Sequence, residues 1–115
     1  MLEAVRIINL EANLPTAEEA LKLLSEAIDA ARKDGVKALK VIHGYVSSGV
    51  GGVLRQRVQK SLVNRRNQRK IRACVFGDKW DTFEQVARDV LEACPELSKD
   101  RDLNRGNEGI SIVLL

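Results

Sequence analysis

The chain has 115 residues, which is the usual size of one domain. Hydrophobic residues make up 44% of the sequence and charged residues 30%, a composition typical of a folded globular protein. No apolar run approaches the roughly 18 residues of a membrane span, and the acidic Glu3 and Glu11 argue against a secretory signal. We therefore expect a single cytoplasmic domain over residues 1–115, with no membrane partner and with a monomer as the favoured state.

The cysteine and histidine count argues against a structural zinc site, which needs about four such ligands. The chain has one histidine and two cysteines, Cys74 and Cys94, without a CxxC spacing. In the absence of a secretory signal, reduced core thiols are favoured over a disulfide. Aromatic residues make up only 3% of the chain, so there is almost no platform on which bases could stack.

The first half of the chain reads as strand, helix, strand, helix. Residues 4–8 predict a buried strand, and Thr16 with Glu19 forms a capping box for an amphipathic helix that ends at Asp34 and Gly35. A strand over residues 36–42 leads into a glycine loop. The next helix is predicted to begin near residues 51–52, with a buried stripe of residues at every fourth position: Val50, Leu54, Val58 and Leu62.

The second half continues the alternation. A basic turn is predicted over residues 64–70 and a third strand over 71–76. Asp81 with Glu84 then caps a helix, which Pro95 ends. The apolar residues of that helix, predicted to form its buried face, are Phe83, Val86, Ala87, Val90, Leu91 and Cys94. Trp80 is predicted to be a lid or a packing residue, residues 95–108 a polar loop, and residues 110–115 a buried strand. The β-α-β-α-β-α-β order predicts an α/β fold with a four-stranded sheet containing at least one parallel pair.

Positive charge is concentrated in residues 36–77, which contain ten Lys and Arg residues and no Asp or Glu. The rest of the chain has nine basic and sixteen acidic residues, so the net charge of +3 hides a strong asymmetry. Such a block favours a polyanionic partner. No acid lies within the block to pair with the basic side chains of its helix. We therefore predict phosphate contacts for Arg55, Arg57, Lys60, Arg65 and Arg66.

The glycine loop "VIHGYVSSGVGG", residues 41–52, lies between a predicted strand and a predicted helix. Unpaired N–H groups at a helix start can bind an anion, and glycines let the backbone approach a phosphate closely. Gly44 and Gly49 have the separation of a P-loop, but Val50 and Gly51 follow instead of Lys and Ser or Thr, and no dinucleotide motif is present. The loop is either a simple turn or an anion site, and the basic helix after it favours the anion site.

The stretch "TAEEALKLLSEAIDAARKDGVKALKVIHGYVSSGVGGVLRQRVQKSL", residues 16–62, resembles the Smr (Small MutS-Related) domain family, in which a strand runs into H-G-x-G-x-G before a helix opening with L-R. The resemblance implies a two-layer α/β sandwich with a mixed four-stranded sheet, similar to the C-terminal domain of translation initiation factor 3. It also implies nucleic-acid binding, and several members cleave DNA or RNA. The family's L-D-x-H-G motif is altered here to "INLEA", with Asn9, Glu11 and Ala12 at the Asp, His and Gly positions, and Val46 replaces a glycine of the second motif. Residues 78–105 have the character of an insertion before the last strand.

Together these observations predict a module that grips the backbone of DNA or RNA through the glycine loop and the basic helix. Besides the five basic residues above, the predicted contacts are Gly44, Tyr45, Ser47, Ser48, Gly49, Gly51 and Gly52. The alternative is a weak, structure-selective endonuclease with His43 as acid or base, although His43 could instead fix the loop. No cofactor is expected, except Mg²⁺ or Mn²⁺ in the nuclease case, where Glu11 is a weak candidate ligand. A third interpretation is a binder of small phosphorylated molecules or of proteins.

Overall fold

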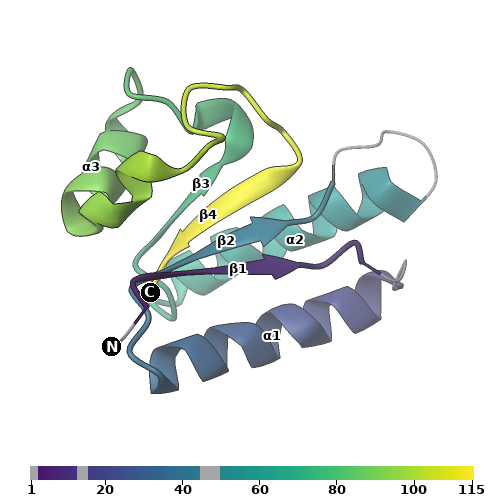
Figure 1. Ribbon diagram of the computed structural model, residues 1–115. Coiled ribbons are helices and arrows are strands. Elements are labelled where there is room, and N and C mark those ends of the chain that lie inside the picture. The colour runs from purple at the N-terminus through teal and green to yellow at the C-terminus, as the bar shows by residue number, and fades with distance from the viewer. Residues whose placement is uncertain (1–2, 13–15, 45–49) are drawn as a thin grey trace.

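A computed structural model describes residues 3–12, 16–44 and 50–115, except for the side chains of the helical residues 50–52. Its centre is a mixed sheet of β1 (Val5–Asn9), β2 (Ala38–Ile42), β3 (Ala73–Phe76) and β4 (Ile110–Leu114), in the order β1-β2-β4-β3 (Figure 1). β1 and β2 are parallel, whereas β4 runs antiparallel to both of its neighbours. The predicted α/β fold with a mixed four-stranded sheet is therefore confirmed.

One face of the sheet is covered by the two long helices, α1 (Ala17–Lys33) and α2 (Val50–Asn67) (Figure 1). The Thr16 hydroxyl oxygen accepts a hydrogen bond from the Glu19 N–H at 3.1 Å, so the helix begins at the predicted cap. Of the predicted α2 stripe, Leu54, Val58 and Leu62 are buried in the core formed with α1 and β2, as the four-residue spacing predicted. The side chain of Val50, the fourth member, lies outside the described part of the structure. The two helices thus lie side by side with a shared core beneath them.

The second face is partly covered by shorter elements: η1 (Gly77–Lys79), α3 (Gln85–Ala93) and η2 (Pro95–Lys99). Trp80 is completely buried there and packs with residues of α3, η2, β3 and β4, as a packing residue rather than a lid. These elements add a helical layer to the two layers expected. They cover β1 only in part on this face, since Val5 packs against this core while the Ile7 side chain is largely exposed. Among the described residues, no helix is both long and apolar enough to cross a membrane.

Two predicted boundaries are wrong, each for a local reason. α2 continues to Asn67 through most of the expected basic turn, because no glycine or proline interrupts residues 53–67, and the chain turns only near Arg69, whose φ is 60°. α3 starts at Gln85 rather than after Asp81, because the Asp81 carboxylate accepts hydrogen bonds from the N–H groups of Phe83 and Glu84 and caps a preceding turn. Phe83 is consequently 91% exposed instead of lying on the buried helix face.

The segment predicted as a polar loop, residues 95–108, is anchored to the sheet. Leu97 of η2 is buried in the second core. The Lys40 ammonium, from β2, donates to Asp100 at 2.7 Å and to Asp102 at 2.5 Å, and the Trp80 indole N–H donates to Asp100 at 2.9 Å. Buried charges are stable only when paired in this way, so these contacts fix the course of the segment.

The cysteines are buried free thiols on opposite faces of the sheet, as the prediction of reduced core residues required. Burial raises the pKa of both thiols, which keeps them protonated and unreactive.

Candidate nucleic-acid interface

The altered motif at residues 8–12 and the retained His43-Gly44 pair lie next to each other, where β1 and β2 end. Parallel pairing brings these strand ends together, and the Leu10 N–H donates to the Ile42 carbonyl at 2.8 Å. Gly44 has a φ of +76°, and a Cβ at this position would lie 2.4 Å from a carboxylate oxygen of Glu11. The positive φ therefore favours glycine at this position, and the Glu11 carboxylate lies directly against the start of the glycine loop.

His43 is completely buried beside this contact. Its Nδ1 lies 2.8 Å from the Gly44 carbonyl oxygen, and its Nε2 lies 2.9 Å from Ser111 Oγ. Because a carbonyl can only accept, Nδ1 carries the proton and Nε2 accepts from the serine hydroxyl. Burial lowers the pKa of His43, against the opposing effect of the Gly44 carbonyl, and the positive charge of Arg55 lowers it further. The ring is thus neutral near pH 7, with both nitrogens engaged.

Backbone contacts also hold this part of the loop. The N–H groups of His43 and Gly44 both donate to the Gly109 carbonyl at 3.0 Å. The amide of Gly44 is therefore not free to receive an anion. His43 has the geometry of a residue that fixes the loop, and its ring does not reach the surface. Tyr45, Ser47, Ser48 and Gly49 lie outside the described residues, and Gly51 and Gly52 belong to the first turn of α2.

The strand-end cluster, defined as Glu11, His43, Gly44, Arg55 and Glu108, carries charges of both signs. The Arg55 guanidinium lies 3.8 Å from the Glu108 carboxylate, and both side chains are partly exposed. Among the described residues, no three His, Cys, Asp or Glu side chains gather as a metal site would require. Asn9, next to Glu11, uses its side-chain oxygen to accept from the N–H groups of Glu11 and Ala12. The Asn9 oxygen is thus engaged by backbone N–H groups, and binding of Mg²⁺ or Mn²⁺ at Glu11 stays a prediction.

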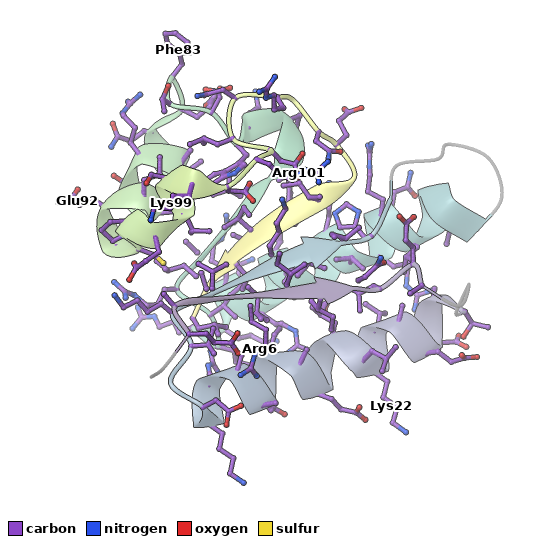
Figure 2. All side chains as sticks on the ribbon, in the orientation of Figure 1. Arg6, Lys22, Phe83, Glu92, Lys99 and Arg101 are labelled. Atoms are coloured by element: carbon purple, nitrogen blue, oxygen red, sulfur yellow. The ribbon has the colours of Figure 1, made fainter. Side chains whose placement is uncertain are left out.

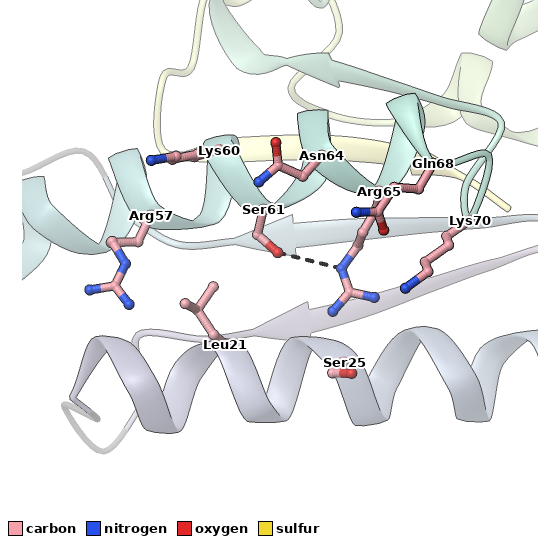
Figure 3. Close-up of a pocket in the computed structure, with 9 residues that line it drawn as sticks. All are labelled: Leu21, Ser25, Arg57, Lys60, Ser61, Asn64, Arg65, Gln68 and Lys70. Atoms are coloured by element: carbon pink, nitrogen blue, oxygen red, sulfur yellow. Dashed lines mark hydrogen bonds between the residues drawn. The ribbon is translucent and has the colours of Figure 1, made fainter.

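A second feature lies on the helical face of the molecule. A groove of about 450 Å³ runs between α1 and α2 (Figure 3). We call it the α1–α2 groove; its lining residues are Leu21, Ser25, Arg57, Lys60, Ser61, Asn64, Arg65, Gln68 and Lys70. Four of these nine side chains are cationic and none is acidic. Within the described ranges, no carboxylate oxygen lies within 4 Å of any of these four cations.

The five predicted phosphate-binding residues are therefore divided by the fold. Arg57, Lys60 and Arg65 line the α1–α2 groove, and the Arg65 Nε donates to the Ser61 hydroxyl at 3.4 Å (Figure 3). Arg55 belongs to the strand-end cluster, and Arg66 is exposed outside the groove, where its charge acts on the Cys74 thiol.

Several groove residues were not predicted, namely Ser25, Ser61, Asn64, Gln68 and Lys70. The positions 57, 61, 64 and 68 recur at steps of three and four, which places them on one side of a helix. That spacing could have identified the α2 wall of the groove from the sequence.

The comparisons with known proteins agree with this architecture. The family model of the Smr domain matches residues 13–82. Among solved structures, the chain is similar to the Smr domain of Thermus thermophilus MutS2, with 21% sequence identity, a TM-score of 0.58 and coverage of 96% of both chains. At this identity the likeness establishes the fold. A search of curated proteins gave no match.

Proposed function

Since the chain belongs to the Smr domain family, we propose that it binds nucleic acid, and that its main contact is between the α1–α2 groove and the phosphate backbone. The observation that carries the proposal is the gathering of four cationic side chains in one groove whose described lining contains no acid. Lys and Arg that neutralise phosphates release condensed counterions, which supplies affinity independent of sequence. Ser, Asn and Gln side chains between the cations can add hydrogen bonds to phosphate and sugar oxygens.

The α1–α2 groove suits this role better than the strand-end cluster. In the cluster, Arg55 is already 3.8 Å from Glu108, and Glu11 adds a second carboxylate beside Gly44. A phosphate held 4 Å from one carboxylate would be opposed by about 1 kcal/mol in water and more where water is displaced. In the groove the cations have no such competitor among the described residues. A contribution from residues 45–49, as the sequence predicted, stays a prediction.

The geometry of His43 favours a binding module over the endonuclease alternative. A general acid or base must lie within hydrogen-bond reach of the reacting group, whereas this imidazole is buried and both of its nitrogens are occupied. We therefore expect tight binding without His43-dependent cleavage. Incubation with branched DNA and with RNA, with and without Mg²⁺ or Mn²⁺, tests this, because product that disappears in His43→Ala would support the enzyme instead.

The binding surface itself is tested by two double variants of equal charge. Arg57→Ala/Lys60→Ala removes two groove cations. Lys99→Ala/Arg101→Ala removes two exposed cations from the opposite side of the sheet, next to η2 (Figure 2). At about 0.1 M salt each lost phosphate contact weakens binding roughly fivefold. We expect the groove variant to bind an oligonucleotide about 25-fold more weakly and the control less than threefold more weakly. Equal losses in the two variants would reject the groove as the contact surface.

A further inference from the structure

The α1–α2 groove, we infer, receives one strand of nucleic acid and contacts its sugar–phosphate backbone rather than its bases. The inference rests on the proposed function and names the class of ligand that the groove accepts. It concerns strandedness and base contact, which the charge of the groove alone does not decide.

The charge of the groove lies on one wall. Arg57, Lys60 and Arg65 come from α2 and Lys70 follows its end, whereas α1 contributes only Leu21 and Ser25 (Figure 3). With a rise of about 1.5 Å per residue, the α2 cations at positions 57 to 65 extend over about 12 Å of helix. All the positive charge of the groove therefore comes from the α2 side, which suits one line of phosphates better than the two lines of a duplex.

The surface of α1 next to the groove carries no net positive charge. Glu18 precedes Leu21 by three residues and Asp29 follows Ser25 by four, so each lies on the same side of the helix as its groove-lining partner. Both carboxylates are exposed beside the equally exposed Lys22 and Arg32, and none of these four side chains lines the groove. A duplex with one backbone in the groove would carry its second backbone across α1, where no net positive charge receives it and where Glu18 and Asp29 oppose it. A single strand has no second backbone to repel.

The groove offers no surface on which a base could stack. Its described neutral lining consists of Leu21 and of hydroxyl and amide side chains, which bond to phosphate and sugar oxygens. Single-strand binders that hold bases use aromatic platforms. Here Trp80 is buried on the other face of the sheet, and Phe83 points away from the molecule on the α3 side (Figure 2). The bases of a strand in this groove therefore face outward, and binding is independent of sequence.

The test uses fluorescence anisotropy with four probes of about twelve nucleotides: a mixed-sequence DNA strand, the corresponding RNA strand, the DNA duplex and an abasic DNA strand. We expect both base-bearing single strands to bind at least fivefold more tightly than the duplex, and the abasic strand to bind within twofold of the DNA strand. Four contacts predict a log–log salt slope of about −2.8 for a single strand. Equal or tighter binding of the duplex, or a loss of tenfold or more without bases, would overturn the inference.

The role of the α1 carboxylates is tested by Glu18→Gln/Asp29→Asn, with Asp29→Asn alone as a second variant that leaves the first turn of α1 unchanged. Both should narrow the preference for the single strand by raising duplex affinity more than single-strand affinity. An unchanged ratio of single-strand to duplex affinity in both variants would contradict the role assigned to α1. If no probe binds at low salt, the proposed function fails. If all probes bind through Arg57 and Lys60 but the duplex is preferred, only the present inference fails.

Discussion

Replacing Lys40 with methionine should destabilise the domain strongly, because this lysine neutralises two carboxylates on the less covered face of the sheet. The Lys40 side chain is 5% exposed, and its ammonium bonds Asp100 at 2.7 Å and Asp102 at 2.5 Å. Burial would raise the pKa of Asp102, but hydrogen bonds from Lys40 and Asn107 hold it below its usual value. Methionine keeps the length of the side chain and removes the charge, so both carboxylates would stay in the protein without a cation.

Breaking a buried ion pair by removing one partner typically costs about 3–5 kcal/mol. For a domain of this size, about 4 °C of melting temperature is lost per kcal/mol, so the midpoint should fall by about 12–20 °C. Urea unfolding followed by circular dichroism measures the free energy directly. The triple variant Lys40→Met/Asp100→Asn/Asp102→Asn also removes the two unpaired carboxylate charges. It should recover at least half of the unfolding free energy lost in Lys40→Met.

Two results would refute this account: a loss below about 1 kcal/mol in Lys40→Met, or no recovery in the triple variant. Folded Lys40→Met should bind single strands as the unmodified protein does, because Lys40 faces α3 and η2, whereas the α1–α2 groove lies on the other face. This binding measurement separates a role in holding residues 95–108 from any role in ligand contact.

Two further predictions concern residues that the sequence highlighted. Arg57→Ala should weaken single-strand binding about fivefold at 0.1 M salt. Arg55→Ala, two residues away on the same helix, should weaken it less than twofold, because Arg55 is paired with Glu108. Equal losses of affinity in anisotropy titrations would contradict the division of the basic residues between the groove and the strand-end cluster. In the unfolded chain His43 has the ordinary pKa of 6.5, whereas in the folded protein its pKa is lowered. The unfolded state therefore binds the proton first, and the unfolding free energy should decrease as pH falls through 6.5 toward the folded pKa. Urea titrations at pH 7.5 and pH 5.5 measure this decrease in unfolding free energy, which should be smaller in His43→Gln than in the unmodified protein. Equal decreases in the two proteins would reject a neutral buried imidazole.

The parts of the fold that depend on nearby residues could be predicted from the sequence. α1 has its cap at Thr16, its apolar spacing and its terminating Gly35 within one continuous segment, and all three appear in the structure. The buried stripe of α2 was predictable for the same reason, since four-residue spacing determines a helix face without reference to the rest of the chain. The Smr resemblance also identified residues 9–12 and 43–44 as the positions of its two motifs, and parallel pairing of β1 and β2 brings these positions together.

Features that depend on distant contacts could not be predicted in this way. Lys40 alternates with apolar neighbours in a strand, but its partners lie 60 and 62 residues away, so nothing local indicates that it is buried with them. The α1–α2 groove likewise needs the packing of two helices to place Ser25 opposite Arg65. The burial of His43 follows from contacts with Gly109 and Ser111 at the start of β4, far along the chain.

The charge pattern of the sequence takes on a different meaning once these distant contacts are known. Residues 36–77 contain ten basic and no acidic residues, which favoured a polyanionic partner for the block as a whole. Three of the ten are paired by acids from residues 96–108: Lys37 by Glu96, Lys40 by Asp100 and Asp102, and Arg55 by Glu108. The acidic segment thus neutralises β2 and the beginning of α2 and leaves the cations of the α1–α2 groove without carboxylate partners among the described residues. A ligand attracted by the net charge of the block would therefore be directed to the helical face, and segregation of charge by folding, rather than the number of basic residues, would determine where a phosphate backbone binds.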